Sequence, residues 1–147
     1  MKPGYAMAVF TGYLEFDTKG DTDIIDVTSR VAGIVASSAI ADGAVLVFAP
    51  GSTAAITTLE YEPGLVSDLR EVLDRLVPAD MHYQHHEKWH DGNGHSHIRA
   101  SLLGQSRSFP VINGNILLGT WQQIIFIDLD NRPRSRKVVV QVCGERA

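Results

Sequence analysis

Residues Gly114–Val142 read GNILLGTWQQIIFIDLDNRPRSRKVVVQV, and this stretch carries most of the information about the fold. The Asn113–Gly114 pair at its start predicts a type I′ hairpin, with Asn115–Leu118 as the returning strand. Two further runs of apolar and β-branched residues have the length of strands, Trp121–Leu129 and Lys137–Cys143. Strands that follow one another through short turns favour an antiparallel sheet.

Outward from this stretch, the chain adds further strands and two helices. In Pro63–Val77 the Leu and Val residues recur at the spacing of an amphipathic helix, and Pro78 ends it. A second helix is predicted from Thr28 to about Ile40, because its apolar residues fall near one face. The remaining predicted strands are Tyr5–Thr18, Asp23–Val27, Ala44–Ala49, Thr53–Glu60, Ile98–Leu103 and Arg107–Ile112.

Turn residues suggest how some of these strands pair. Ala44–Ala49 and Thr53–Glu60 flank Pro50–Gly51, so we expect a core hairpin or two adjacent strands. Ile98–Leu103 and Arg107–Ile112 are expected to pair around Gly104. With about eight strands and two helices, the sequence predicts a single α+β domain over residues 1–147, built on an antiparallel β-sandwich.

Composition narrows the functional classes. The 147 residues are 44% hydrophobic and 20% charged, as in ordinary globular proteins. A formal net charge of −4 argues against nucleic-acid binding, which depends on surplus Lys and Arg. Cys143 is the one cysteine, so no intrachain disulfide can form, and no apolar run approaches the roughly 18 residues of a membrane span. We therefore expect a cytoplasmic protein without a membrane partner.

All six histidines fall within His82–His97, which reads HYQHHEKWHDGNGHSH. We expect His95 and His97 at the start of a strand, where a two-residue period points both rings to one face. Together with His85 they can supply the three protein ligands of a divalent ion such as zinc. The alternative is a polar, exposed loop, which is the preferred interpretation for His82, His86 and His90 taken singly.

Residues next to this segment can line a pocket for a phosphorylated ligand. Ser52 and Thr53 can offer hydroxyl and backbone N–H groups to a phosphate, or form a plain turn. Ser101 follows His97 by four residues on the same predicted strand face. Arg136 can attract a phosphate, or belong to a charged turn that protects a sheet edge.

Four further residues, Trp121, Gln122, Asp91 and Asn93, can have either a structural role or a role in the site. Trp121 is either a pocket residue or an anchor in the core or an interface, and Gln122 can donate a hydrogen bond into a pocket. Asp91 and Asn93 either form the turn of the loop or hold a histidine by its second ring nitrogen.

Three segments together resemble one family: AAITTLEYEPGL at Ala54–Leu65, GHSHIRASLLG at Gly94–Gly104, and Gly114–Val142. They are similar to the YjbQ-like family, also labelled secondary thiamine-phosphate synthases. The resemblance implies a sandwich with two helices, a homotrimer, and a polar pocket with a metal or phosphate site at or near the subunit boundary. It also implies a weak activity that joins hydroxymethylpyrimidine pyrophosphate to thiazole phosphate.

The family motifs fall on particular residues of this chain. Its Tyr-x-His matches Tyr83 and His85, its His-x-His matches His95 and His97, its Gly-Thr-Trp-Gln matches Gly119–Gln122, and its acidic position before the second helix matches Glu60. The resemblance thus makes Glu60, His85, His97 and Gln122 the candidate catalytic residues. Glu60 would serve as a fourth ligand, as a carboxylate that fixes an imidazole tautomer, or as a general base.

One position departs from the family pattern. Members usually have His-Thr-Thr or His-Thr-Ser after a proline, and this chain has Gly51-Ser52-Thr53 after Pro50. The protein then binds an ion with fewer ligands, recruits another histidine of the loop, or has lost the ancestral activity. Two functions follow: a metal-assisted enzyme acting on a phosphorylated small molecule, or a non-catalytic trimeric protein that binds a metal or metabolite.

Overall fold

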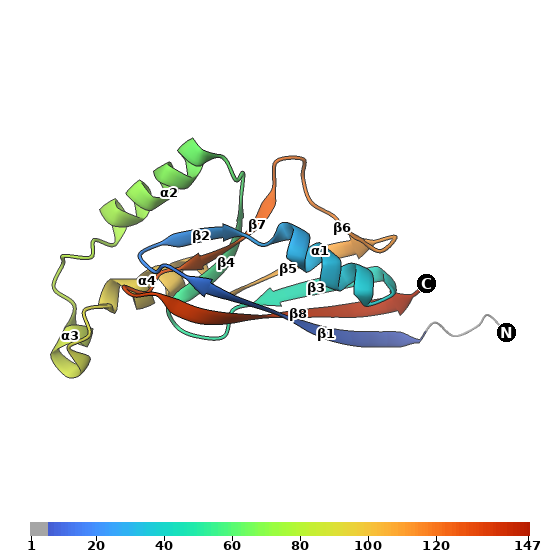
Figure 1. Cartoon of the computed structure of the whole chain (residues 1–147), viewed down its shortest axis with the longest axis horizontal. Helices are drawn as coiled ribbons and strands as arrows, with labels where there is room; N and C mark the ends of the chain where they lie inside the picture. Colours follow the sequence, from blue (N-terminus) through green and yellow to red (C-terminus); the bar gives the residue numbers. More distant parts are fainter. Residues whose placement is uncertain (1–5) are drawn as a thin grey trace.

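Two antiparallel sheets form the frame of the protein, whose computed structural model describes residues 6–147 (Figure 1). The five-stranded sheet has the order β1-β8-β3-β5-β6, and the three-stranded sheet has the order β2-β7-β4. The strands are β1 (Met7–Thr18), β2 (Asp23–Asp26), β3 (Ile40–Phe48), β4 (Ala54–Leu59), β5 (Ser106–Ile112), β6 (Asn115–Ile116), β7 (Gln123–Asp128) and β8 (Arg134–Arg146). The helices are α1 (Thr28–Ser37), α2 (Pro63–Leu76), α3 (Gln84–Trp89) and α4 (Gly94–Leu103).

The predicted α+β class with eight antiparallel strands is confirmed, but the described residues contain four helices where two were predicted. The first residue of the predicted strand Tyr5–Thr18, Tyr5, lies outside the described residues. The predicted turn at Asn113–Gly114 is confirmed, since both residues have positive φ (50° and 76°) and join β5 to β6. The returning strand is shorter than predicted and ends at Ile116.

The expectation of a strand at Ile98–Leu103 is wrong, because this segment belongs to α4. Ser96, Ala100 and Leu103 turn toward the protein at the i, i+4, i+7 spacing of a helix, and Ser96 and Ala100 are fully buried. A short apolar run cannot distinguish a strand from a buried helix by periodicity alone. The helix also overturns the expected pairing of this segment with β5.

The expected pairing of Ala44–Ala49 with Thr53–Glu60 is also wrong. β3 lies in the five-stranded sheet and β4 in the three-stranded sheet, so the loop around Pro50 carries the chain from one sheet to the other. Backbone hydrogen bonds fix both ends of the crossing: the Ala49 N–H donates to the Gln105 carbonyl, and the Leu129 N–H donates to the Thr53 carbonyl. This crossing places Ser52 and Thr53 at the end of the three-stranded sheet.

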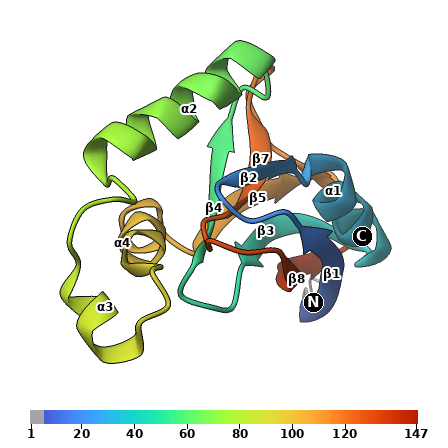
Figure 2. The ribbon, with the colours of Figure 1, turned by 60° about the vertical axis from the view of Figure 1, so that its left-hand side comes forward.

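Three layers follow from the burial pattern. The main core lies between the two sheets and under α1, and its centre includes Val138, Val140 and Phe126. A second core fills the space between the other face of the three-stranded sheet and helices α2 and α4, where Ile125 and Ala100 are fully buried. α3 lies beyond α4, at the end of the molecule opposite the C-terminus (Figure 2). Among the described residues, no helix is both long and apolar enough to cross a membrane.

Candidate functional site

His85 and His97 come together from two short helices. His85 lies on α3 and His97 on α4, and their ring centroids are 4.6 Å apart at an interplanar angle of 43°. The His85 Nδ1 lies 3.5 Å from an Asp91 carboxylate oxygen and has no hydrogen-bond partner among the described residues. Two imidazoles beside a carboxylate can exchange protons or bind a cation. We call His85, His97 and Asp91 the histidine pair site.

The surroundings of His97 favour its neutral form. Burial is the main cause that lowers the pKa of His97, and the nearby His85 lowers it further. Asp91, Asp130 and the Ser52 backbone act in the opposite direction without reversing the shift. His97 is therefore uncharged at neutral pH and has a ring nitrogen available as an acceptor.

Asp130, two residues after the end of β7, links the loop of the histidine pair site to the sheets. Its carboxylate accepts hydrogen bonds from Arg134 (2.7 Å), the Thr53 hydroxyl (3.2 Å) and the Asn131 N–H (2.8 Å). Burial opposes its ionisation, but these bonds and the Arg134 charge outweigh burial and lower the pKa of Asp130. The carboxylate stays ionised and holds the loop in place.

The Asn93 amide can donate a hydrogen bond to either of two nearby carboxylates, Asp130 or Asp91. In one orientation its nitrogen donates to Asp130 over 3.3 Å, and in the other it donates to Asp91 over 2.9 Å. Amide oxygen and nitrogen are told apart only by their hydrogen bonds, and the second orientation pairs donors with acceptors better. Asn93 therefore helps to fix the loop, which agrees with its predicted role in forming the turn.

Arg136 lies beneath this network in a buried ion pair. Its guanidinium donates two 2.8 Å hydrogen bonds to the two Asp128 oxygens and a third, of 2.9 Å, to the Thr53 hydroxyl. Thr18 donates to the same carboxylate over 2.5 Å. Because Asp128 and Thr53 take the hydrogen bonds of the Arg136 Nε and Nη2, the placement of Arg136 favours a structural role over the predicted contact with a phosphate.

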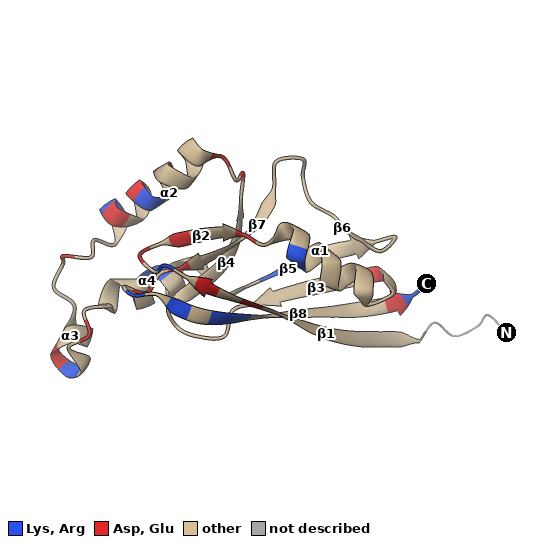
Figure 3. Cartoon of the chain, viewed as in Figure 1, with Lys and Arg blue, Asp and Glu red and all other residues tan. Residues whose placement is uncertain are grey.

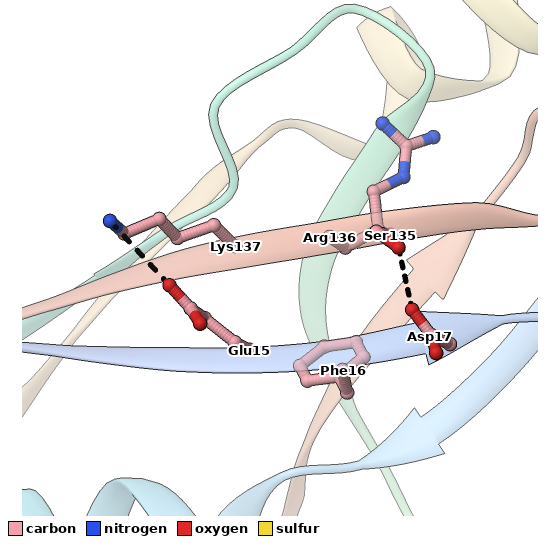
Figure 4. A pocket seen from close by; sticks show the side chains of 6 residues that line it. All are labelled: Glu15, Phe16, Asp17, Ser135, Arg136 and Lys137. Carbon is pink, nitrogen blue, oxygen red and sulfur yellow. Dashed lines mark hydrogen bonds and ion pairs between the residues drawn. The ribbon is translucent and has the colours of Figure 1, made fainter.

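A hollow of about 420 Å³ adjoins Arg136 on the outer side of β1 and β8 (Figure 4). There Lys137 pairs with Glu15 over 3.7 Å, and the Ser135 hydroxyl donates to Asp17 over 2.6 Å. Figure 4 shows the Arg136 side chain extending away from these pairs, as its bonds to Asp128 require. In this hollow Glu15 and Lys137 thus neutralise each other, and the Asp17 carboxylate is bonded to a hydroxyl.

His95 does not join the pair, and the expectation that His95 and His97 share one strand face is wrong. Both lie on α4, where residues two apart point about 200° away from each other. The His95 ring is 6% exposed and 6.4 Å from the Tyr83 ring. Burial, followed by the Arg99 charge, lowers the pKa of His95, and its Nδ1 has no hydrogen-bond partner among the described residues.

A strained turn lies next to His95. Gly20, Asp21 and Thr22 all have positive φ, and 64° is rare for a β-branched residue such as Thr22. Arg70 donates to the Thr22 carbonyl and Arg99 to the Thr22 hydroxyl, so two arginines hold the turn. The turn presents Asp21 toward His95, where its charge opposes the other shifts of the histidine.

Glu60, Trp121 and Gln122 lie at the other end of the three-stranded sheet. β4 starts beside Asp128 and ends beside Gln123, so Thr53 and Glu60 are separated by the length of this strand, about 20 Å at 3.3 Å per residue. At this end a hollow of about 450 Å³ is lined by Thr58, Leu59, Glu60, Gly119, Thr120, Trp121 and Gln122.

The two residues of the Gly-Thr-Trp-Gln motif differ in exposure and in bonding. Trp121 is 71% exposed, which excludes its interpretation as a core residue. The Gln122 amide accepts from the Gly119 N–H over 3.0 Å and donates to the Thr58 hydroxyl over 3.3 Å. The predicted site residues thus form two separate groups within one chain.

Of the remaining predicted residues, Thr53 belongs to the Asp130 network and Ser52 faces His97 through its backbone. Ser101 is exposed on α4, so its predicted place on a strand face is wrong. His82 is exposed and pairs with Glu87, as the solvated interpretation requires. His86 is half-buried instead, because its Nε2 accepts the Gly94 N–H over 3.2 Å.

Gly51, which replaces the family histidine, uses a backbone conformation that other residues rarely adopt. Its φ is +131°, and an added Cβ would lie 3.5 Å from an Arg136 nitrogen. A histidine at this position would be strained in the backbone conformation that Gly51 adopts.

The described part of one chain does not assemble a three-ligand metal centre. Among residues 6–147, no three His, Cys, Asp or Glu side chains are grouped so that they could hold a metal ion. The histidine pair site offers two imidazoles and one carboxylate that is 3.5 Å from His85. A bound ion would need further donors.

Comparisons with known proteins identify the family. The sequence model of the UPF0047 protein YjbQ-like family matches residues 12–145. This chain belongs to the YjbQ-like UPF0047 family. A UPF0047 protein of Methanothermobacter thermautotrophicus is 45% identical over 145 residues, which are 99% of each chain. A UPF0047 protein of Archaeoglobus fulgidus is 41% identical over 128 residues, covering 87% of this chain and 97% of the relative.

The fold of the YjbQ-like chain agrees with solved structures. The crystal structure of a YbjQ-like protein of unknown function from Sulfolobus solfataricus matches with a TM-score of 0.91 at 34% identity, covering 95% of this chain and 100% of the other. A crystal structure of a YjbQ/UPF0047 family protein from Clostridium acetobutylicum matches with a TM-score of 0.78 at 39% identity, covering 88% and 98%.

Sequence reasoning missed Asp128, Asp130 and Arg134 as parts of the site. Their signal was the Asp-Leu-Asp at the end of a buried strand followed by an arginine-rich turn. Alternate residues at a strand end point to one side, which brings both carboxylates to the edge that the histidine loop covers.

Proposed function

We propose that this YjbQ-like protein is an enzyme that acts on a phosphorylated small molecule, with the histidine pair site as its reactive centre. By resemblance to the family, the reaction is the joining of a pyrimidine pyrophosphate to a thiazole phosphate, and the active form is a homotrimer. The observation that supports the proposal is the approach of His85 and His97 to 4.6 Å beside Asp91.

The pair is suited to carry one positive charge. His85 lowers the pKa of His97, which means that protonation of one ring disfavours protonation of the other. When the thiazole nitrogen bonds to the pyrimidine methylene carbon, the bond from that carbon to the pyrophosphate oxygen breaks. A protonated imidazole can neutralise the departing oxygen, while its neutral partner accepts hydrogen bonds from the substrate.

The second group of residues suits the ring portion of such a substrate. Trp121 presents an exposed aromatic surface for stacking, and Glu60 and Gln122 lie beside it in the same hollow. Within one chain the length of β4, about 20 Å, separates this group from Thr53, which lies at the histidine end of the three-stranded sheet. In the proposed homotrimer, a neighbouring copy contributes its Trp121 end to the histidine pair site, consistent with a pocket at the subunit boundary.

The binding of a divalent ion such as zinc stays a prediction. His85 and His97 would hold it, and the ion would neutralise a phosphate oxygen. Because residues 6–147 contain no group of three such ligands, the remaining donors would come from substrate, water or a neighbouring copy. Metal analysis of the purified protein against His97→Ala tests this part separately.

Gly51 favours a second candidate, a non-catalytic trimeric protein that binds a metal or metabolite. The family histidine is absent, and a φ of +131° makes the position unsuited to regain it without a change of the loop. In this alternative, the pocket still binds its ligand but cannot catalyse the reaction, because one catalytic group is absent.

Turnover measurements test the enzyme. The natural chain, His97→Gln and His82→Gln are compared with pyrimidine pyrophosphate and thiazole phosphate, and pyrophosphate release is followed. General acid–base catalysis is typically worth about 10²–10⁴-fold, so His97→Gln should lose at least tenfold. His82→Gln is the matched control, since His82 is exposed and bonded only to Glu87. Equal turnover by all three would contradict the proposal, and no turnover with retained ligand binding would support the non-catalytic alternative.

A further inference from the structure

Helix α3, which carries His85, has little of its own to hold it in place. It spans six residues, and none of them is buried. Helices of this length are unstable in water by themselves and depend on packing against the rest of the protein. The position of His85 opposite His97 is therefore decided by the contacts that the α3 segment makes with its surroundings, α4 above all.

Among the described residues, no ion pair joins α3 to α4. The Lys, Arg, Asp and Glu residues of the two helices are Glu87 and Lys88 on α3 and Arg99 on α4 (Figure 3). Glu87 bonds to the exposed His82, and the Lys88 Nζ lies 5.1 Å from the centroid of the Trp89 ring. Charge does not place α3 on α4, so we looked for a contact between closely packed atoms.

Gly94, the first residue of α4, leaves room for Tyr83 to lie directly against it. A Cβ at this position would lie 2.7 Å from the Tyr83 Cβ and 2.9 Å from its Cγ, closer than real side chains approach. The φ of Gly94 is negative, so close approach and not backbone conformation requires glycine here. The Gly94 N–H also donates to the His86 Nε2 of α3 over 3.2 Å.

Tyr83, which precedes α3, is held by both its ring and its hydroxyl. It is 8% exposed, and its ring lies 5.5 Å from the His86 ring and 6.4 Å from the His95 ring. Its hydroxyl donates a 2.6 Å hydrogen bond to the Pro78 carbonyl. A buried tyrosine of this kind combines apolar packing with one directed polar contact.

Arg99 holds the chain just before Pro78. This α4 residue is 3% exposed, and its Nε and Nη2 donate to the Val77 carbonyl over 3.0 Å and 2.8 Å. The segment that leads into α3 is thus attached to α4 at both ends, by Arg99 at its start and by Gly94 at its end. Such a segment has little freedom to change its distance from α4.

We propose that Gly94 and Tyr83 are positioning residues, which set how closely His85 approaches His97. His85 follows Tyr83 by two residues and His97 follows Gly94 by three, so a shift at the Tyr83–Gly94 contact moves one ring relative to the other. A misplacement of about 1 Å can cost about 10²-fold in rate. The consequence for the rate rests on the proposed function, whereas the positioning itself does not.

Cross-relaxation between the ring protons of His85 and His97 measures this approach directly. Its rate falls with the inverse sixth power of distance, and the ring centroids are 4.6 Å apart in the natural chain. Gly94→Ala should weaken the cross-peak about threefold for a displacement of about 1 Å, because the added methyl group pushes Tyr83 away. Gly33→Ala is the matched control, since it also replaces a helical glycine but its Cβ meets nothing within 4 Å.

A second pair of variants separates positioning from the loss of a hydrogen bond. Tyr83→Phe keeps the ring and removes the bond to Pro78, and it should also weaken the cross-peak. Tyr61→Phe is its control, because the Tyr61 hydroxyl likewise donates to a backbone carbonyl, that of Ile24, at the other end of the three-stranded sheet. This control should leave the cross-peak unchanged.

Two results would overturn the proposal. One is an unchanged cross-peak in Gly94→Ala, or in Tyr83→Phe where Gly94→Ala does not fold. The other is an equal loss of the cross-peak in Gly33→Ala or Tyr61→Phe. The spectra are recorded without substrate, so they decide the positioning even where the proposed chemistry fails.

Discussion

Replacing Arg136 should destabilise the protein more than any nearby surface change. Arg136→Leu leaves Asp128, which is fully buried, with the Thr18 hydroxyl and the Asp130 N–H but without its countercharge. Removing one partner of a buried ion pair typically costs about 3–5 kcal/mol. Against a total stability of about 5–15 kcal/mol, this loss is a large share.

The double replacement separates the cost of an unpaired buried charge from the cost of losing the two side chains. In Asp128→Leu with Arg136→Leu no charge is left unpaired, and apolar replacements of buried pairs are often neutral or better. We therefore expect the double variant to recover most of the loss. The Thr53 hydroxyl loses the Arg136 bond in both cases, so part of the cost remains.

Urea unfolding followed by far-UV circular dichroism measures these differences. Protein concentration is held constant, since association contributes to apparent stability. Lys137→Met is the matched control on the next residue, because the Lys137–Glu15 pair is exposed and worth at most about 1 kcal/mol. If Arg136→Leu cost no more than Lys137→Met, the account of Asp128 and Arg136 as the structural base of the site would be refuted.

Further predictions concern the loop and the histidines. Gly51→Ala should lower the free energy of unfolding by about 1 kcal/mol or more, since φ is +131°, whereas Ser52→Ala should change it little; equal effects would contradict the backbone argument. The lowered pKa of His97 means that the unfolded chain binds its proton more readily, so stability present above pH about 6.5 should be lost as pH falls below that value. His97→Gln should reduce this pH dependence in urea titrations, and an unchanged slope would refute it. His86→Ala should speed amide exchange at Gly94, because the Nε2 acceptor is lost.

The strands were predictable from the sequence because their signals are local. Alternation identified β1, and the Asn113–Gly114 turn identified the β5–β6 hairpin. The transfer of the chain from β3 to β4 was not predictable in the same way. Ala44–Ala49 and the following strand are both apolar, and periodicity does not tell which sheet a buried strand joins.

The candidate site was predicted in part. The pair of His85 and His97 was within the predicted set, but the strand that was to bring in His95 is a helix, which turns that ring elsewhere. The separation of Glu60 from the histidines follows from the direction of β4, which a motif comparison does not contain. Tertiary placement therefore decided which predicted residues act together.

The histidine pair is tested most directly by observing its ring nitrogens. Long-range ¹H–¹⁵N spectra of the imidazoles follow each histidine through a pH titration, with and without thiazole phosphate. We predict that His97 titrates below pH 6.5, that its pKa rises in His85→Gln, and that ligand shifts both rings while exposed His82 stays unchanged. A His97 that titrates independently of His85, with ligand effects no larger than those at His82, would contradict a shared reactive centre.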